Sequence, residues 1–382
     1  MRRDIFTEEH QQFREQFKRF AEREIVPKVE GWNARGMSDR ETWRRAGAEG
    51  FLGANAPAEY GGAGADFLYD AIVMEEMARI RAHGMMISLH SDICMPYIAT
   101  YGSDAQKENY LPGAIRGEIL LGIAMTEPGT GSDLANVQTK AIRHGDHYVL
   151  NGSKIFISNG QIGDLFIVVA KTDPHAKPAH RGVSLLLVEA NSPGFVRGRK
   201  LDKLGLKGQD TSELAFEDCI VPLDNLLGQE GQGFKMLMEK LQQERLCIAV
   251  ASMASCRRAL DDTLAYVKQR HAFGRPIGTF QNTQFKLAEL ATEVEIGQAF
   301  VDKLLAAHVR GEDVVIEVSM AKWWTTDLQK RLTSECLQLH GGYGFMHEYP
   351  ISTDYADAAV QSIYAGTNEI MKVIIARRMG LE

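Results

Sequence analysis

The first third of the chain has its apolar residues spaced as in amphipathic helices. Phenylalanines recur at helical intervals with charged residues between them, at Phe6, Phe13, Phe17 and Phe20. Thr7, followed by two glutamates, has the sequence of a helix N-cap with acidic residues in the first turn. The same pattern predicts helices over Phe67–Ile80 and Ser103–Leu111, and the second is expected to end at Pro112.

Strand-like segments begin near Ile123. Two Asn-Gly pairs, Asn151-Gly152 and Asn159-Gly160, lie between runs of β-forming residues. Asn-Gly is a strong signal for a hairpin turn, because both residues tolerate positive φ. Further strands are predicted at Leu165–Ala170, Gly182–Glu189 and Glu213–Ile220. These elements predict a compact antiparallel β domain.

The last third returns to a helical pattern. Long stretches with no Pro and few Gly predict helices over Phe234–Arg270, Gln281–Arg310 and Val314–Gly341. A fourth helix is predicted over Ala359–Met379, broken at Gly366 and Thr367. Four helices of this kind are typical of a helical bundle.

The order of elements is therefore helical, then β, then helical. We predict an α+β fold with an N-terminal helical domain at 1–122, a middle antiparallel β domain at 123–232 and a C-terminal four-helix bundle at 233–382. Because strands and helices are segregated, a Rossmann-type parallel sheet is disfavoured. The chain also lacks a glycine-rich dinucleotide motif after a strand and a P-loop motif, so classical NAD and ATP sites are not indicated.

The composition is that of an ordinary globular protein and excludes some functions. The 382 residues include 43 Lys and Arg against 50 Asp and Glu, for a formal net charge of −7. This balance argues against a nucleic-acid binder, which depends on basic contacts to phosphates. The longest apolar runs are far shorter than the ~20 residues of a membrane span, and no signal-peptide pattern is present, so we expect a cytoplasmic protein.

The cysteines indicate neither a disulfide framework nor a zinc site. The chain has 5 cysteines, an odd number, and none forms a C-x-x-C pair. We expect reduced, mostly buried thiols and no bound metal.

Four loop segments have residues suited to binding a cofactor, although each alone is also explained by ordinary structure. Ala124–Asp133 combines glycines with hydroxyl groups, and Arg270–Gln281 has arginines that suit a pyrophosphate. Gln338–Phe345 has adjacent glycines, which are also typical of a helix C-cap. Ile363–Asn368 has the sequence of a helix start capped by Thr367 or Asn368.

Glu244, in the predicted long helix, is a candidate chemical group. Lys240 four residues earlier allows a surface ion pair worth only ~0.3–0.5 kcal/mol, and a solvated glutamate is the ordinary interpretation. The apolar stretch Leu246–Val250 that follows weakens this interpretation.

Taken together, these segments resemble the acyl-CoA dehydrogenase family over nearly the whole chain. Thr126-Glu-Pro-Gly-Thr-Gly-Ser-Asp133 resembles the T-E-P-x-x-G-S-D flavin segment of that family, and Phe156-Ile-Ser158 stands in place of W-I-T or W-I-S. The remaining matches, in the expected order, are Glu213–Pro222 with E-L-x-F-x-[DN]-x-x-V-P, Arg270–Gln281 with R-x-x-F-G…F-Q, Gln338–Gly342 with Q-x-x-G-G and Tyr364–Thr367 with Y-x-G-T.

The resemblance implies non-covalently bound FAD at a site shared between protomers. In one protomer it implies cofactor contacts from Ile123, Met125, Thr126, Gly131, Ser132, Phe156, Ile157 and Ser158. From a neighbouring protomer it implies Arg270, Phe273, Gln281, Gln338, Gly341 and Gly342. It also implies cofactor contacts from Gly366, Thr367 and Asn368. The implied substrate contacts are Ser132, Arg245, Ala365 and Gly366. This arrangement implies an obligate oligomer, usually a homotetramer made of two dimers.

Ala365 departs from the pattern of the family. Many members carry the catalytic glutamate at this position, in Y-E-G-T, whereas this chain has Tyr364-Ala365-Gly366-Thr367. Long-chain and isovaleryl-type members place the base on the long helix, immediately before an arginine. Glu244 and Arg245 fit that placement, so Glu244 is the predicted base.

The resemblance implies α,β-desaturation of a long-chain or branched acyl-CoA. Glu244 would take the Cα proton, the Cβ hydride would pass to flavin N5, and an electron-transfer flavoprotein would accept the electrons. The backbone N–H of Ala365 would support the thioester oxygen. Two alternatives are an oxidase-like flavoenzyme that uses oxygen and, because of Ala365, a catalytically silent acyl-CoA-binding flavoprotein.

Overall fold

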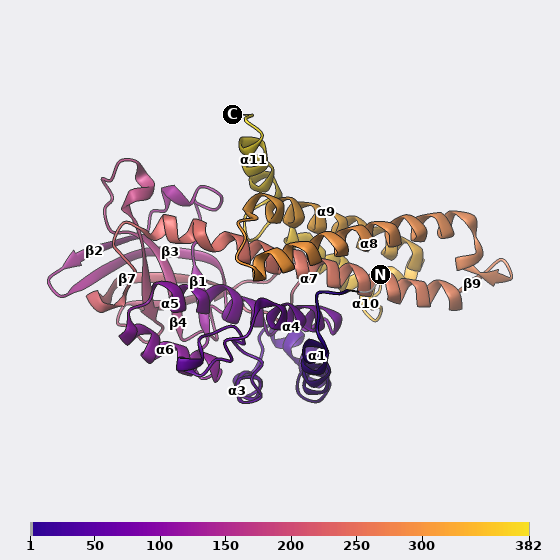
Figure 1. The fold of residues 1–382 in the computed structure, drawn as a ribbon, viewed down its shortest axis with the longest axis horizontal. Coiled ribbons are helices and arrows are strands. Elements are labelled where there is room, and N and C mark those ends of the chain that lie inside the picture. Colours follow the sequence, from indigo (N-terminus) through magenta and orange to yellow (C-terminus); the bar gives the residue numbers. More distant parts are fainter. Residues whose placement is uncertain (1–2, 382) are drawn as a thin grey trace.

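Helices form the N-terminal part of the chain in the computed structural model, which describes residues 3–381 (Figure 1). Their bounds are α1 Glu8–Phe20, α2 Val29–Arg35, α3 Arg40–Ala48, α4 Phe67–Arg79, the π-helical turn η4 Leu89–Cys94, α5 Met95–Tyr101 and α6 Asp104–Ile115. The expected N-cap of α1 is confirmed, because the Thr7 side chain accepts a hydrogen bond from the backbone N–H of His10. Phe17 and Phe20 are fully buried and pack against Phe51.

The predicted end of α6 at Pro112 is wrong. The helix continues through Pro112 to Ile115. Proline removes only one backbone donor, and the turn that it would have ended buries Leu111, Ala114 and Ile115 in the core. Burial of this apolar face therefore outweighs the lost hydrogen bond.

The central part is one mixed sheet with the strand order β6-β7-β3-β2-β4-β5-β8, and β1 adds to it beside β4. The strands are β1 Leu121–Ala124, β2 Lys140–His144, β3 His147–Ser158, β4 Leu165–Lys171, β5 Val183–Glu189, β6 Phe195–Lys200, β7 Thr211–Pro222 and β8 Leu226–Leu227. Most pairs are antiparallel, as expected, but β1 and β2 each pair with β4 in parallel. The sheet is thus mainly, not wholly, antiparallel.

Only one of the two predicted Asn-Gly turns forms. Asn159, with φ 59°, begins a turn directly after β3, whereas Asn151 and Gly152 lie inside β3 at an irregularity of its pairing with β7. Asn151 exchanges hydrogen bonds with Asp218 of β7, which explains why the strand continues. The hairpin between β2 and β3 turns instead at Gly145, with φ 62°.

Long helices form the C-terminal part. They are α7 Gly233–Gln269, α8 Gln281–Val309, α9 Val315–His340, α10 Pro350–Gln361 and α11 Asn368–Arg378, and a two-residue hairpin of β9 His271–Ala272 and β10 Arg275–Pro276 joins α7 to α8. The predicted broken helix over Ala359–Met379 is two separate helices, α10 and α11. Thr367 caps α11 by accepting from the N–H of Ile370.

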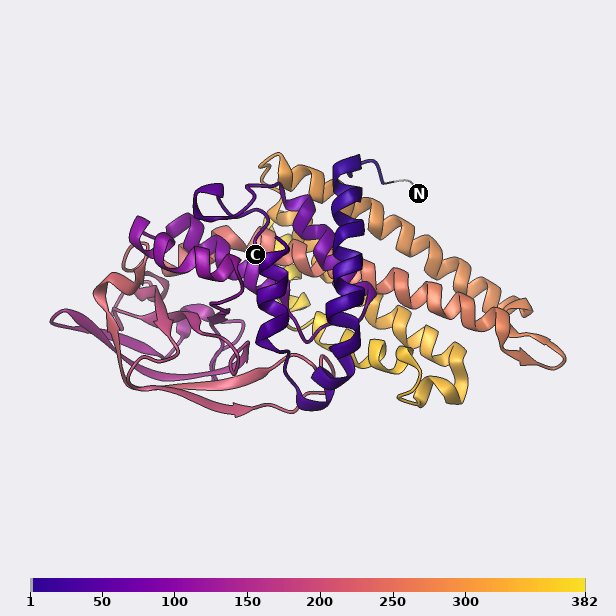
Figure 2. The same ribbon diagram turned by 90° about the horizontal axis from the view of Figure 1, so that it is seen from below.

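The sheet and the bundle lie at opposite ends of an elongated molecule, and the N-terminal helices cover one side of both (Figures 1 and 2). β4 is buried on both faces, because Ile167 and Val169 pack with the N-terminal helices while Phe166 and Val168 belong to a second core on the other face of the sheet. A third core lies within the bundle.

His90 joins η4 to the sheet. Its ring contacts the N–H of Leu121 at 3.1 Å and the carbonyl oxygen of Ala114 at 3.0 Å. Burial lowers the pKa of His90 to about 4, so the ring is neutral at physiological pH and can accept from one group while donating to the other. This contact fixes η4 and the following α5 beside the start of β1.

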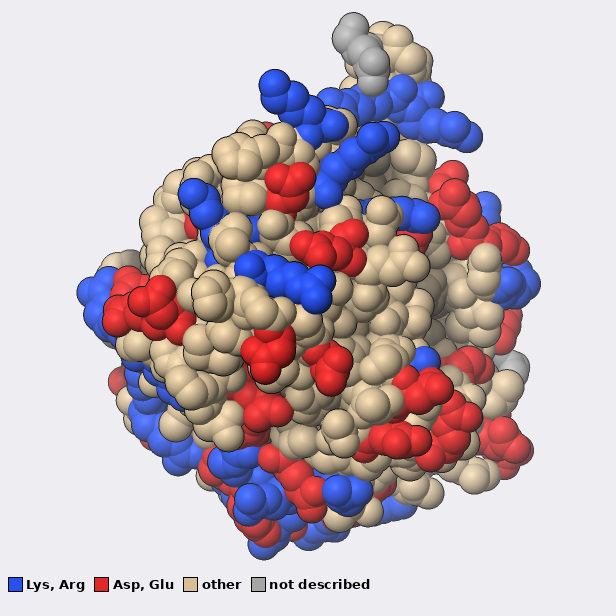
Figure 3. All heavy atoms as spheres, turned by 90° about the vertical axis from the view of Figure 1, so that its left-hand side faces the viewer, with Lys and Arg blue, Asp and Glu red and all other residues tan. Residues whose placement is uncertain are grey.

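The surface charges are mixed, and the cysteines lie inside the protein. On the face seen in Figure 3, basic and acidic side chains are interspersed, apart from a basic group near the C-terminal helix. All of Cys94, Cys219, Cys247, Cys256 and Cys336 are free and buried, as expected. Within residues 3–381, no helix has both the length and the apolar character of a membrane span, and no cluster of His, Cys, Asp or Glu is suited to hold a metal ion.

Candidate active site

Glu244 is a buried carboxyl group held by a tyrosine. It lies on α7 with 5% of its surface exposed, and its Oε1 atom accepts a hydrogen bond of 2.7 Å from the hydroxyl group of Tyr97 on α5. Burial raises the pKa of Glu244 to about 7, although Tyr97 and the nearby charges of Arg245 and Lys240 act in the opposite direction. Such a carboxyl group can take up a proton near neutral pH.

The two cations beside Glu244 on α7 are bound elsewhere. Lys240 donates to Thr100 at 2.6 Å, so the surface ion pair considered from the sequence does not form. Arg245 is 3% exposed and donates to Ser319 of α9 at 3.2 Å, while its Nε atom has no partner within residues 3–381. Its contact with the substrate stays a prediction, and the structure places it inside the protein between α7 and α9.

Lys322 of α9 holds the turn before α11 by hydrogen bonds. This lysine is fully buried and donates to the carbonyl oxygen of Gly366 at 2.7 Å and to Asn368 Oδ1 at 3.1 Å. Asn368 in turn donates to Asp327 at 2.9 Å. Ala365 has φ 51°, and within the described residues its N–H makes no hydrogen bond. The turn thus presents an available backbone donor.

The glycine-rich segment after β1 is shaped by a buried ion pair. Lys154 of β3 donates to Glu127 Oε1 at 2.8 Å and to the carbonyl oxygen of Met125 at 3.0 Å. Glu127 also accepts from the backbone N–H of Thr139 at 2.9 Å. The pair holds the backbone of this segment beside β3, where the N–H of Ile155 donates to the carbonyl oxygen of Thr126 at 2.9 Å.

Phe156 is an exposed aromatic side chain on strained backbone. It has φ 61°, an unusual value for a residue with a bulky side chain, and 63% of its surface is exposed. It lies where the pairing of β3 with β7 is irregular, between Lys154 and Ile157. Strain of this kind is concentrated at functional sites. The exposed ring, next to the segment of Met125 and Thr126, suits a flat aromatic ligand such as a flavin.

The structure gathers the predicted cofactor residues into two groups. Ile123, Met125, Thr126, Phe156 and Ser158 lie together at the sheet, while the side chain of Ile157 is buried in the sheet core. Gly131 and Ser132 lie in the exposed loop that follows β1.

The second group lies at the far end of the bundle. The guanidinium group of Arg270 lies 5.2 Å from the ring centre of Tyr343, which brings the β9–β10 hairpin against the segment that contains Gly341 and Gly342. Arg270, Phe273, Gln281, Gln338, Gly341 and Gly342 are all exposed, and Phe273 is 95% exposed. Figures 1 and 2 place this hairpin at the opposite end of the chain from the sheet, so one chain does not bring the two groups together.

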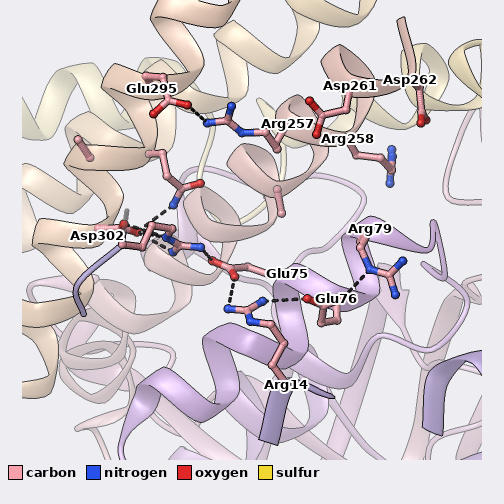
Figure 4. Close-up of a pocket in the computed structure, with 14 residues that line it drawn as sticks. Arg14, Glu75, Glu76, Arg79, Arg257, Arg258, Asp261, Asp262, Glu295 and Asp302 are labelled. Carbon is pink, nitrogen blue, oxygen red and sulfur yellow. Dashed lines mark hydrogen bonds and ion pairs between the residues drawn. The ribbon is translucent and has the colours of Figure 1, made fainter. Parts of the chain in front are cut away.

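A groove of about 610 Å³ lies away from all these residues. It is lined by charged residues of α4, α7 and α8, by Arg14 of α1 and by Arg3 before that helix, and many of these charges pair with one another (Figure 4). Arg3 bonds Glu75 at 2.7 Å and Asp302 at 2.6 Å, and Arg14 bonds Glu75 at 2.8 Å. These ion pairs connect the N-terminal segment to α4 and α8.

Sequence reasoning missed Tyr97, Lys154 and Lys322. Each acts through a partner far along the chain, for example 147 residues away for Tyr97 and Glu244. Neither local periodicity nor motif spacing reports such a contact. The helical neighbours of Lys322 on α9 include the polar residues Ser319, Thr325 and Thr326, so no local pattern signals its burial either.

Family models and known proteins match nearly the whole chain. Models described as the N-terminal, middle and C-terminal domains of acyl-CoA dehydrogenase match residues 7–118, 122–219 and 231–380. The mitochondrial long-chain specific acyl-CoA dehydrogenase of Mus musculus is 48% identical over 377 residues, covering 99% of this chain and 88% of that protein.

Solved structures agree with these matches. An acyl-CoA dehydrogenase from Geobacillus kaustophilus has a TM-score of 0.97 and 52% identity, with 98% of each chain covered. An acyl-CoA dehydrogenase from Bacillus anthracis, solved in complex with FAD, has a TM-score of 0.91 and 32% identity, covering 98% of this chain and 67% of that one.

The order of helices, sheet and helices, the exposed aromatic side chain at the sheet and these matches define a flavin-dependent oxidoreductase. The chain belongs to the acyl-CoA dehydrogenase family. It is an enzyme that oxidises CH–CH groups, and its cofactor is FAD.

Proposed function

We propose that this enzyme desaturates the Cα–Cβ bond of a long-chain or branched acyl-CoA in fatty-acid oxidation, with Glu244 as the base. The observation that supports this assignment is a buried carboxyl group with a pKa of about 7 on α7, combined with a methyl group at Ala365. A long acyl chain is favoured by the name of the relative from Mus musculus.

Glu244 removes the Cα proton in this proposal. Its pKa near neutrality matches a base that must be ionised before the reaction and hold a proton after it. The negative charge that develops on the thioester oxygen needs donors, and one such donor is worth roughly 3–4 kcal/mol. The N–H of Ala365 is available for this role, and Lys322 holds the adjacent Gly366 in place.

FAD, when bound, supplies at flavin N5 an acceptor for the Cβ hydride. We assign Ile123, Met125, Thr126, Gly131, Ser132, Phe156, Ile157 and Ser158 to the flavin end and Gly366, Thr367 and Asn368 to the same site. Ser132, Arg245, Ala365 and Gly366 are assigned to the substrate. Arg270, Phe273, Gln281, Gln338, Gly341 and Gly342 would come from a neighbouring protomer.

The separation of the two groups supports an oligomer with shared sites, which we propose to be a homotetramer. Each chain exposes its β9–β10 hairpin at the end of the molecule opposite the sheet (Figure 1), whereas Phe156 is exposed on β3 of the sheet. The helix α11 projects from the chain, and Val373 of this helix and Met379 directly after it are exposed, which suits contact with another protomer.

We also propose that the chain has three structural parts, at 1–122, 123–232 and 233–382. The electrons would pass from the flavin to an electron-transfer flavoprotein.

The test is an anaerobic titration of the FAD-loaded enzyme with acyl-CoAs of increasing chain length, including branched ones. We expect the wild-type flavin absorbance to bleach, with the tightest response for the preferred chain. The variant Glu244→Gln should keep its FAD and lose turnover by about 10²–10⁴-fold. Peroxide formed in air at the rate of turnover would instead indicate an oxidase.

Glu239→Gln is the matched control, because Glu239 is a partly exposed glutamate of the same helix that also accepts from a tyrosine, Tyr101, at 2.6 Å. It should keep full turnover. Ala365→Glu should restore part of the activity in the Glu244→Gln protein. Wild-type turnover in Glu244→Gln would refute the assignment of the base.

A further inference from the structure

Tyr97, the tyrosine that contacts Glu244, is itself buried and packed in the core. Tyr97 has no exposed surface and is part of the core that joins the N-terminal helices to the sheet. Its helix, α5, starts directly after η4, which His90 fixes to β1. The hydroxyl group of Tyr97 therefore has a defined position relative to α7.

Tyr97 is the hydrogen-bond donor to the Glu244 carboxylate within residues 3–381. The two cations next to Glu244 on its own helix are directed to Thr100 and to Ser319, and neither forms an ion pair with it. The hydrogen bond uses Oε1, and the other oxygen, Oε2, accepts no hydrogen bond within the described residues. A flexible glutamate side chain thus has one oxygen fixed and one available.

We infer that Tyr97 is a positioning residue for the base, whose hydroxyl group holds Oε1 of Glu244 so that Oε2 is directed to the Cα–H of the acyl-CoA. This inference rests on the proposed role of Glu244. A donor to a carboxylate also favours its ionised form, which opposes the effect of burial. Burial and the charge of Glu244 raise the pKa of Tyr97 well above its usual value, so the phenol stays a donor at any working pH.

Several other titratable groups lie around Glu244 and stay unchanged in the test. Arg245 and Lys240 act on Glu244 by their charge, and the charge of Glu244 in turn acts on Cys94 and Cys247. Among the groups next to these, Asp70 and Asp92 act on Cys247, Cys247 acts on Tyr364, Arg245 acts on Lys322 and Tyr101 acts on Tyr97. A change at Tyr97 alone therefore reports the hydrogen bond to Glu244.

The experiment compares Tyr97→Phe with wild type in steady-state assays with palmitoyl-CoA and an artificial electron acceptor across pH. We expect FAD content and KM to stay within about twofold, and kcat to fall about tenfold. The rising limb of the kcat/KM profile should move up by about one pH unit, because the lost donor favoured the ionised base. The protein with 3-fluorotyrosine at position 97, whose hydroxyl group is a stronger hydrogen-bond donor, should have its rising limb of the kcat/KM profile at lower pH.

Tyr101→Phe is the matched control, because the hydroxyl group of Tyr101, one helical turn later, donates to Glu239 on the same α7 at 2.6 Å. It should leave kcat and the profile unchanged. If Glu244→Gln is inactive, an unchanged pH profile in Tyr97→Phe, or an equal shift in Tyr101→Phe, would overturn the inference about Tyr97 and leave the proposed base intact. Activity in Glu244→Gln would instead overturn the proposed base.

Discussion

The ammonium group of Lys322 on α9 donates to the carbonyl oxygen of Gly366, 2.7 Å away and 44 residues later in the chain. The same group reaches Asn368, so one buried lysine fixes the turn that precedes α11. Burial lowers the pKa of Lys322 to about 8, with repulsion from Arg245 acting in the same direction. The protein thus keeps a costly buried amine beneath the turn whose backbone N–H, at Ala365, we propose as a donor to the substrate.

Replacing this lysine should disturb the turn more than the fold. We expect Lys322→Met to lower the free energy of unfolding by about 1–3 kcal/mol, because Gly366 and Asn368 lose a buried partner. Turnover should fall further than stability alone explains, since the N–H of Ala365 moves with the turn. Urea unfolding and steady-state assays measure both effects. Lys372→Met on α11, which removes a cation over the ring of Trp323, is the control and should retain turnover.

The titration of Glu244 should appear in the stability of the protein. Burial raises the pKa of Glu244 from 4.5 to about 7, so between these pH values the folded form binds more protons than the unfolded chain. The contribution of this group to the free energy of unfolding therefore decreases as pH rises through that window. Glutamine does not ionise, so the free energy of unfolding of Glu244→Gln does not decrease in this way. The variant should be more stable than wild type by up to roughly 3 kcal/mol above pH 7.

Denaturant unfolding of wild type and Glu244→Gln at pH 5 and pH 8, at one protein concentration, tests this expectation. The advantage of the variant should grow with pH. Glu239→Gln should show the same difference from wild type at both pH values. A gap between wild type and Glu244→Gln that is constant with pH would mean that Glu244 is solvated in the folded protein.

The buried pair of Lys154 and Glu127 should be needed for FAD binding. Lys154→Met leaves the Glu127 carboxylate buried without its ion partner, and breaking such a pair costs about 3–5 kcal/mol. We expect lower stability and weaker FAD retention after gel filtration, because the carbonyl oxygen of Met125 also loses its donor. Lys140→Met, at an exposed lysine of β2, should retain FAD. Full FAD retention in Lys154→Met would contradict this role.

A site shared between protomers predicts complementation between two inactive chains. Phe156→Ala and Phe273→Ala each remove an exposed aromatic ring from one of the two groups and should each weaken FAD binding. In a mixed dimer one site carries both changes and the other carries neither, so about one quarter of all sites should be intact in a statistical mixture. Recovery of activity on co-expression measures this fraction. No recovery would indicate sites formed within single chains.

Local patterns in the sequence predicted the elements well where one face of a helix or strand decides the outcome. The N-cap at Thr7 and the long helices α7, α8 and α9 follow from residues a few positions apart. The motifs also led to the family, because several short segments occur in the expected order. The errors arose where a distant contact outweighed a local signal, as at Pro112 and at Asn151-Gly152.

The sequence by itself determined the order of helices and strands, the family and the candidate carboxyl group at Glu244, since each depends on residue types at short spacing. Only the tertiary structure decided that Glu244 is buried against Tyr97, that Lys154 and Lys322 shape two loops, and that the β9–β10 hairpin lies far from the sheet that carries Phe156. Burial, hydrogen bonding and pKa depend on which distant segments meet. That is a property of the packed chain, which spacing along the sequence does not encode.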